Sequence, residues 1–209
     1  MRKFIFLFIV AGIAVFFQSC RSIKVSEYAV DNAPISPKLP ALEKSFNNNN
    51  NTHVNGYSGI ALNSSHSMQI LNDEFDDNIC NPYGAKYGYV LVSTSYIKSR
   101  AGLGFALISG YTLLLPNLLG FPMGRYYYEM QVTVEILNSK RELIGKYRAI
   151  GKGKAMVAYY YGYGSVSAST KANLDALKGA LRDIRTQIQQ DASRLNNDLQ
   201  TAGPNNINR

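Results

Sequence analysis

Cysteine and histidine are scarce in this sequence, which limits the chemistry it can support. The chain has two cysteines, Cys20 and Cys80, and two histidines, His53 and His66. Because we expect Cys20 to be lipidated, for reasons given below, no intramolecular disulfide can form. Cys80 is then a lone thiol, for which burial is the expected state. Neither histidine has a companion Cys or His at metal-ligand spacing, so we expect no metal and no cofactor.

Catalytic motifs are also missing. The acidic residues between 73 and 77 lack the glycine that a calcium loop needs, and they are better explained as a charged helix face. The segment Gly151–Lys154 lacks the glycine spacing and the Ser or Thr of a phosphate loop. Gly162–Ser165 lacks the flanking glycine of a nucleophile elbow. No triad or carboxylate pair can be nominated, so we predict that the protein is not an enzyme and has no catalytic residues.

Charge is absent from the segment Phe4–Phe17, which follows the basic pair Arg2 and Lys3. As a helix this segment would rise only about 21 Å, short of the roughly 30 Å hydrocarbon core of a bilayer. Its length and flanks instead predict a signal peptide over residues 1–19. The sequence Phe-Gln-Ser-Cys that ends at Cys20 resembles a lipobox, in which the cysteine receives diacylglycerol. A buried cysteine behind a signal anchor is the alternative.

Lipidation would fix where the protein acts. Each acyl CH₂ buried in the bilayer contributes about 0.8 kcal/mol, so two or three chains would hold Cys20 on the membrane. We expect the periplasmic face of the outer membrane. The formal net charge of +8 would ordinarily raise the question of nucleic acid, but export removes that partner. Anionic lipid, lipopolysaccharide, peptidoglycan or an acidic protein remain as partners.

The two ends of the mature chain have the composition of flexible segments. Residues 20–55 contain three prolines and an asparagine run, and they predict a largely disordered tether. Residues 202–209 predict a frayed tail. The segment between them, 56–201, is expected to form a single domain. Its first element is a short amphipathic helix, in which Met68, Leu71, Phe75 and Ile79 recur at helical spacing.

Strand patterns fill the middle of this domain. Tyr87–Lys98 is rich in β-forming residues, and Tyr126–Asn138 alternates apolar and polar side chains. A turn then leads to Leu143–Val157, the expected hairpin partner. One face of this last strand is basic and is a possible anion-binding surface, formed by Lys146, Arg148, Lys152 and Lys154. The opposite face consists of glycine and alanine, which would let a helix pack closely.

A long helix is expected over Ala168–Gln200, where leucine, isoleucine and alanine recur in alternating steps of three and four. At about 1.5 Å per residue it would be roughly 50 Å long, longer than a small sheet would cover. Its second half, with Leu195 and Leu199, is therefore a candidate surface for a protein partner or for homo-oligomerisation. The alternative is that the whole helix packs within the domain.

A second uncharged segment, Ala101–Gly124, interrupts the strands. Five glycines and two prolines disfavour a regular element. We consider three possibilities, in order of preference: a loop that caps the core, a loop that dips into a membrane or a partner, and a true membrane span. Leu114 and Leu118 are the candidate contact residues.

The order of a strand, an apolar loop, a hairpin and a long helix resembles that of small envelope lipoproteins with a TolB amino-terminal-like or curli-secretion-lipoprotein-like domain. The segments that carry the resemblance are Tyr87–Lys98, Ser109–Pro116, Tyr126–Val157 and Asn173–Ile188. It implies an α+β fold, a two-layer sandwich in which a small, mostly antiparallel sheet packs against the long C-terminal helix. It also implies an adaptor or assembly factor that binds an envelope protein. A binder of anionic glycan or lipid is the alternative.

Overall fold

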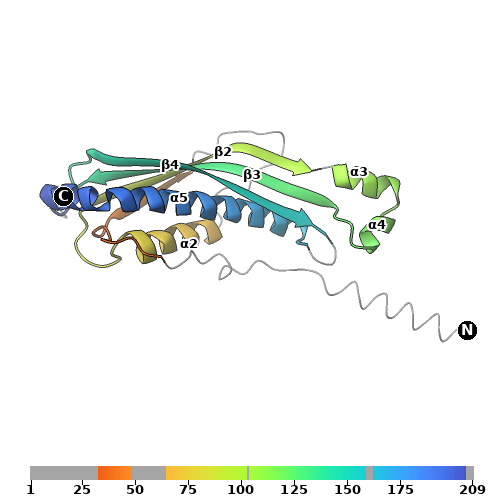
Figure 1. The fold of residues 1–209 in the computed structure, drawn as a ribbon, viewed down its shortest axis with the longest axis horizontal. Coiled ribbons are helices and arrows are strands. Elements are labelled where there is room, and N and C mark those ends of the chain that lie inside the picture. The colour runs from red at the N-terminus through yellow and green to blue at the C-terminus, as the bar shows by residue number, and fades with distance from the viewer. Residues whose placement is uncertain (1–32, 49–64, 103, 159–161, 206–209) are drawn as a thin grey trace, which may run out of the picture.

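The structure is a computed structural model that describes residues 33–48, 65–102, 104–158 and 162–205 (Figure 1). The predicted signal peptide, Cys20 and His53 lie outside the described residues. Within them, four strands form one sheet in the order β1-β2-β3-β4. The long helix α5, Ser165–Ala202, runs along one face of this sheet (Figure 1). The predicted α+β two-layer sandwich is confirmed.

The central strands are β2, Gly88–Gly102, β3, Gly124–Asn138, and β4, Leu143–Val157. They pair antiparallel along their whole length. In β3 the predicted apolar face is buried, because Met130, Val132, Val134 and Ile136 are each 0% exposed. A bulge between Tyr96 and Lys98 shifts the parity of β2 near its end. The only shift between β3 and β4 precedes Gly145, so the alternation of β4 from Gly145 to Val157 is unbroken.

Helix α5 packs against the small side chains of β4. A Cβ atom added to Gly151 would lie 1.7 Å from the carbonyl oxygen of Ala176. The backbones of strand and helix are therefore in direct contact, as the glycine and alanine face predicted. The helix buries its whole apolar stripe, including Leu181, Ile188, Leu195 and Leu199, all 0% exposed.

Residues 33–48 of the predicted tether belong to the domain, which corrects the boundary at residue 56. Strand β1, Glu43–Asn48, pairs parallel with the start of β2. Before it, Ile35 and Leu39 are buried, and their backbone amides donate to the carbonyl oxygens of Asn78 and Ile79 at 2.8 and 2.9 Å. The prolines predict disorder, but a few buried apolar side chains and the parallel pairing of β1 with β2 are enough to order this segment.

The predicted tail is held at its start. Helix α5 ends at Ala202, and the backbone amide of Asn205 then donates to the carbonyl oxygen of Lys86 at 2.6 Å. Residues 203–205 are therefore docked beside the beginning of β2, which corrects the expectation of fraying from residue 202.

Helix α2, Ser65–Asp73, continues into a π-helix, η2, Glu74–Ile79. Phe75 and Ile79 are buried, as their spacing predicted. Glu74 is not on a charged outer face: it is 0% exposed and forms an ion pair with Arg185 of α5 at 3.4 Å. The Nδ2 of Asn78 also donates to this carboxylate at 2.8 Å. The pair ties η2 to α5 inside the core.

Candidate interaction surfaces

The apolar segment between β2 and β3 forms a projection at one end of the molecule, opposite the C-terminal end of α5 (Figure 1). It contains helix α3, Gly104–Tyr111, and the single-turn helix α4, Leu115–Leu118. We call residues 104–119 the tip. Seven of its large apolar side chains are exposed to between 42% and 91%: Leu107, Ile108, Tyr111, Leu113, Leu114, Leu115 and Leu119.

These exposures decide between the three possibilities for this segment. A loop that caps the core would bury its leucines, so that expectation is wrong. A membrane span is also wrong, because β2 and β3 pair up to Gly102 and Arg125 on both sides of the segment. Within the described residues, no helix has the length and apolar character needed to cross a bilayer. A loop that contacts a membrane or a partner fits the geometry. Of the candidate residues, Leu114 is 42% exposed, and nothing is described of the Leu118 side chain.

The turn between α3 and α4 holds two leucines in the left-handed region, with φ of 49° at Leu113 and 63° at Leu114. Side chains larger than asparagine seldom adopt this conformation, which costs of order 1 kcal/mol or more per residue. The turn is closed by the amide of Leu114, which donates to the carbonyl oxygen of Ser109 at 2.8 Å. Residues with strained backbone cluster at functional sites.

Contacts between Phe121 and residues of the tip hold the base of the tip together. The rings of Phe105 and Phe121 meet edge to face with centroids 5.4 Å apart. The buried Asn117 donates through Nδ2 to the carbonyl oxygen of Phe121 at 3.0 Å. Where the tip joins the sheet there is an open hollow of about 220 Å³, lined in part by Ala106 and Met123. It is smaller than the roughly 300–1,000 Å³ clefts that take small molecules.

A second surface lies on the sheet face opposite α5, which we call the outer face. The four predicted basic residues of β4, Lys146, Arg148, Lys152 and Lys154, are all exposed there, so the predicted strand parity is confirmed. The stripe is not purely basic, because Ile150 is 50% exposed between them. Lys146 is paired with Glu135 of β3 at 2.6 Å.

Sequence reasoning missed the cations that β2 and β3 add to the outer face. Two cross-strand rows run over the three strands: Lys98, Glu129 and Lys152 in one, and Arg100, Tyr127 and Lys154 in the next. Arg125 follows, next to the tip. We call Lys98, Arg100, Arg125, Lys152 and Lys154 the basic collar. Arg100 and Arg125 flank the uncharged segment in the sequence. The bulge after Tyr96 changes the alternation of β2, so the sequence pattern did not show that Arg100 lies on the same face as the lysines.

Glu129 is the acidic residue in the two cross-strand rows that contain the basic collar. A hydrogen bond from the Tyr127 hydroxyl lowers the pKa of Glu129, and Lys98, Lys152 and Arg100 act in the same direction. The same hydrogen bond raises the pKa of Tyr127. The carboxylate therefore stays ionised, and its charge is outnumbered by the five cations of the collar.

The candidate surface on the second half of α5 does not exist. Leu195 and Leu199 are 0% exposed, so the expectation of a partner or oligomer seam there is wrong. The reason is the length of the sheet: β2, β3 and β4 each have 15 residues, which at about 3.3 Å per residue span roughly 50 Å. The sheet is as long as the helix, so the whole apolar stripe is covered.

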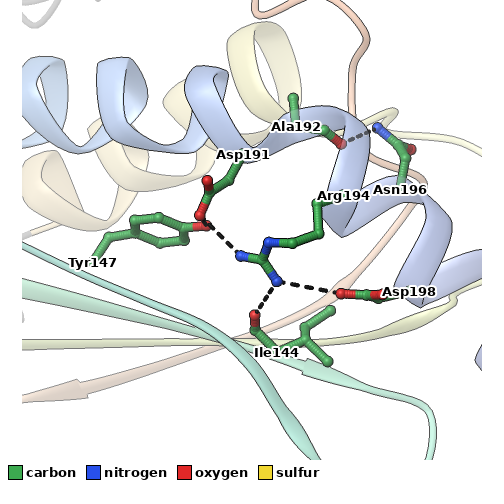
Figure 2. A network of polar contacts seen from close by, with 7 residues as sticks. All are labelled: Ile144, Tyr147, Asp191, Ala192, Arg194, Asn196 and Asp198. Carbon is green, nitrogen blue, oxygen red and sulfur yellow. Dashed lines mark hydrogen bonds and ion pairs between the residues drawn. The ribbon is translucent and has the colours of Figure 1, made fainter.

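Polar side chains of α5 add a structural network on this half of the helix (Figure 2). The carboxylate of Asp191 accepts hydrogen bonds from Tyr147 of β4 at 2.8 Å and from Arg194 at 2.9 Å. Arg194 also donates to the carbonyl oxygen of Ile144 at 2.9 Å. These bonds lower the pKa of Asp191. Burial, followed by the bond to Asp191, raises the pKa of Tyr147. The network fastens the helix to the edge strand.

The described residues offer no cluster of three or more metal-ligating side chains. His66 is partly buried in α2, and Asp76 is paired with Lys44 at 2.6 Å. Cys80 is 3% exposed, as expected, and burial raises the pKa of its thiol to about 12. The tyrosines near the tip pack across strands and onto α5: the hydroxyl of Tyr128, for example, lies 2.8 Å from that of Ser169.

Comparison with known proteins yields no family. No protein-family profile matches the chain, and neither does any curated protein. Among solved structures, it shares a weak likeness with a crystal structure from Caulobacter crescentus CB15 of a protein proposed to be a lipoprotein. The two are 16% identical over 53% of this chain and 67% of the other, with a TM-score of 0.26. A likeness at this level carries no argument, so the resemblance to TolB-like or curli-secretion-like domains stays a prediction.

Proposed function

We propose that this chain is a bacterial lipoprotein, held in the cell envelope through lipidated Cys20, that acts without catalysis by docking its tip on a second envelope component. The observation that carries the proposal is the exposure of the tip. Soluble monomers scatter exposed apolar side chains singly, whereas a contiguous cluster of this kind marks an interaction site.

The proposed lipid anchor and the tip would make two contacts with the envelope at the same time. A lipidated cysteine confines the protein to the membrane surface, so a second, weaker contact through the tip becomes effectively intramolecular. Such a protein works as an adaptor or assembly factor: it holds its folded domain in a defined orientation. With the seam of α5 buried, the tip takes over the docking role that the sequence had also assigned to Leu195 and Leu199.

The basic outer face favours a second candidate function, binding of anionic glycan or lipid such as peptidoglycan or lipopolysaccharide. Its support is the gathering of Lys98, Arg100, Lys152 and Lys154 on two adjacent rows. Such binding would weaken steeply with salt, whereas apolar docking would not.

Photo-crosslinking in intact cells tests the docking role. A photoreactive residue at Leu119, which is 91% exposed in the tip, should give a discrete adduct with protein or lipid. One at Tyr83, which is 88% exposed and precedes the start of β2, whereas the tip follows its end, is the control and should not give that adduct. The double variant Leu107→Ser and Leu115→Ser should remove the adduct without changing the amount or melting temperature of the protein. Identical products from both positions, or an adduct that survives the double variant, would contradict the proposal.

A further inference from the structure

The basic collar lies directly beside the tip, and their relative position indicates what the tip contacts. Arg125 begins β3 immediately after the apolar segment, and it pairs with Gly102, the last residue of β2. One row farther from the tip, Arg100 lies across Tyr127 from Lys154. The molecule therefore has an uncharged end and, at the first rows of strand behind it, a concentration of positive charge.

Three polar side chains of the tip donate to backbone carbonyl oxygens of the same segment. The hydroxyl of Ser109 donates to the carbonyl oxygen of Phe105 at 2.8 Å, and that of Thr112 to Ile108 at 2.7 Å. Asn117 donates to Phe121 in the same way. Tyr111, 91% exposed, adds an aromatic ring with a polar end, the side-chain type that concentrates at membrane interfaces.

The backbone of the turn after α3 and of α4 is also bonded within the segment. The amides of Thr112, Leu113, Leu114, Leu115, Asn117, Leu119, Gly120 and Phe121 each donate to a carbonyl oxygen between residues 108 and 117. A protein partner could satisfy free backbone groups, so its docking surface does not need this property. Hydrocarbon cannot satisfy them, and irregular backbone enters it only when its polar groups are bonded internally.

From these observations we propose that the tip enters the headgroup and acyl boundary of an anionic bilayer while the basic collar contacts the lipid headgroups. The inference rests on the proposed docking role of the tip and names its occupant. Exposed leucines supply the apolar contact, and the collar supplies the preference for anionic lipid, since basic side chains near a charged membrane surface strengthen binding. The sheet then stands away from the membrane, with α5 directed outward from its N-terminal end.

The absence of tryptophan from the chain allows a direct measurement of depth. Residues 21–209 contain every described element, so the experiment uses this mature chain without its lipid, and its melting temperature is checked first. Leu119→Trp places a single indole in the tip, and Tyr83→Trp is the matched control at an equally exposed site. With vesicles of equal parts phosphatidylglycerol and phosphatidylcholine carrying brominated acyl chains, we expect the fluorescence of Leu119→Trp to be quenched and blue-shifted. That of Tyr83→Trp should not change.

The role of the collar is tested by removing charge. Arg100→Gln combined with Lys154→Gln should weaken binding to the same vesicles by about tenfold or more. Arg148→Gln combined with Lys140→Gln removes equal charge away from the tip and should change binding less than the collar pair does. Vesicles of phosphatidylcholine alone should bind the wild type weakly.

The outcomes separate this inference from the proposed function. If the purified chain does not bind the anionic vesicles, or binds them with Leu119→Trp unquenched, the bilayer is not the occupant. Crosslinking of Leu119 to a protein in cells would then leave the docking role standing with a different partner. If the adduct at Leu119 is also missing in cells, the docking role itself fails. Equal losses from the two charge-removal pairs would overturn the role of the collar.

Discussion

A Cβ atom added to Gly153 would lie 1.7 Å from the carbonyl oxygen of Ala172, so the backbones of β4 and α5 touch at this point. The same relationship joins Gly151 to Ala176, one helical turn farther along. Two glycines on one face of β4 thus set the separation of the two layers. The position of α5, and with it the burial of its apolar stripe, depends on these contacts.

Gly153→Ala should therefore force strand and helix apart. We expect a loss of about 3 kcal/mol or more in the free energy of unfolding, at the upper end of overpacking effects because the obstacle is backbone. Gly179→Ala is the control: its Cβ would lie 3.8 Å from the nearest atom, and alanine favours the helix by roughly 0.5–1 kcal/mol. Denaturant unfolding of both variants measures the difference, and a neutral Gly153→Ala would show that the layers are not in contact.

Much of this arrangement could be predicted from the sequence, because periodicity encodes which face of an element is buried. The alternation of β3, the glycine and alanine face of β4 and the stripe of α5 all appear in the structure as expected. A sequence pattern does not show whether a helix and the sheet it packs against have the same length. The expected strand Leu143–Val157 already had the length of the helix, and its start reaches the C-terminal half of α5: Cβ atoms added to Gly145 and Gly88 would lie 3.1 Å from the side chains of Leu195 and Leu199, respectively.

The candidate surfaces were less predictable for a related reason. The tip was recognised as apolar, but whether it folds back on the core depends on the strained turn at Leu113 and Leu114, which no local pattern indicates. The collar depends on cross-strand register and on a bulge near Ile97. The buried pair of Glu74 and Arg185 joins residues 111 positions apart, beyond the reach of any local pattern.

Leu199→Asp tests the corrected account of α5. Because Leu199 is 0% exposed, the substitution buries an unpaired carboxylate and should destabilise the protein by more than about 3 kcal/mol, as Leu181→Asp should. Asn197→Asp introduces the same charge on the exposed side of the helix and should lower the melting temperature only slightly. An unchanged melting temperature for Leu199→Asp would mean that the second half of α5 projects beyond the sheet after all.

The ion pair between Glu74 and Arg185 predicts a non-additive result. Glu74→Leu alone leaves the guanidinium of Arg185 buried without its carboxylate, which should cost about 3–5 kcal/mol of unfolding free energy. Combining Glu74→Leu with Arg185→Leu removes both charges and should be the more stable of the two variants. Chemical denaturation of the single and double variants gives the comparison. A double variant that is less stable than the single one would mean that the two charges are not coupled.

The network around Asp191 predicts a small dependence on acid pH (Figure 2). Its pKa is lowered in the folded state, so its stabilising effect is present above the unfolded pKa of about 3.9 and is lost as the pH falls through the folded value. The group is exposed, so Asp191→Asn should cost less than about 1 kcal/mol at neutral pH. The wild type and the variant should converge in stability once the pH lies below both the folded and the unfolded pKa of this group. A difference in stability that persists at acid pH would mean that Asp191→Asn acts through packing and not through charge.

Fatty-acid labelling at Cys20 tests the central claim most directly, because both the anchor and the orientation of the tip depend on lipidation at this residue. Cells that express the full chain in a bacterial host should incorporate radioactive palmitate into the wild type. Cys20→Ala should remain unlabelled and keep its signal segment, whereas Cys80→Ala should be labelled normally. Equal labelling of wild type and Cys20→Ala would contradict the lipoprotein account.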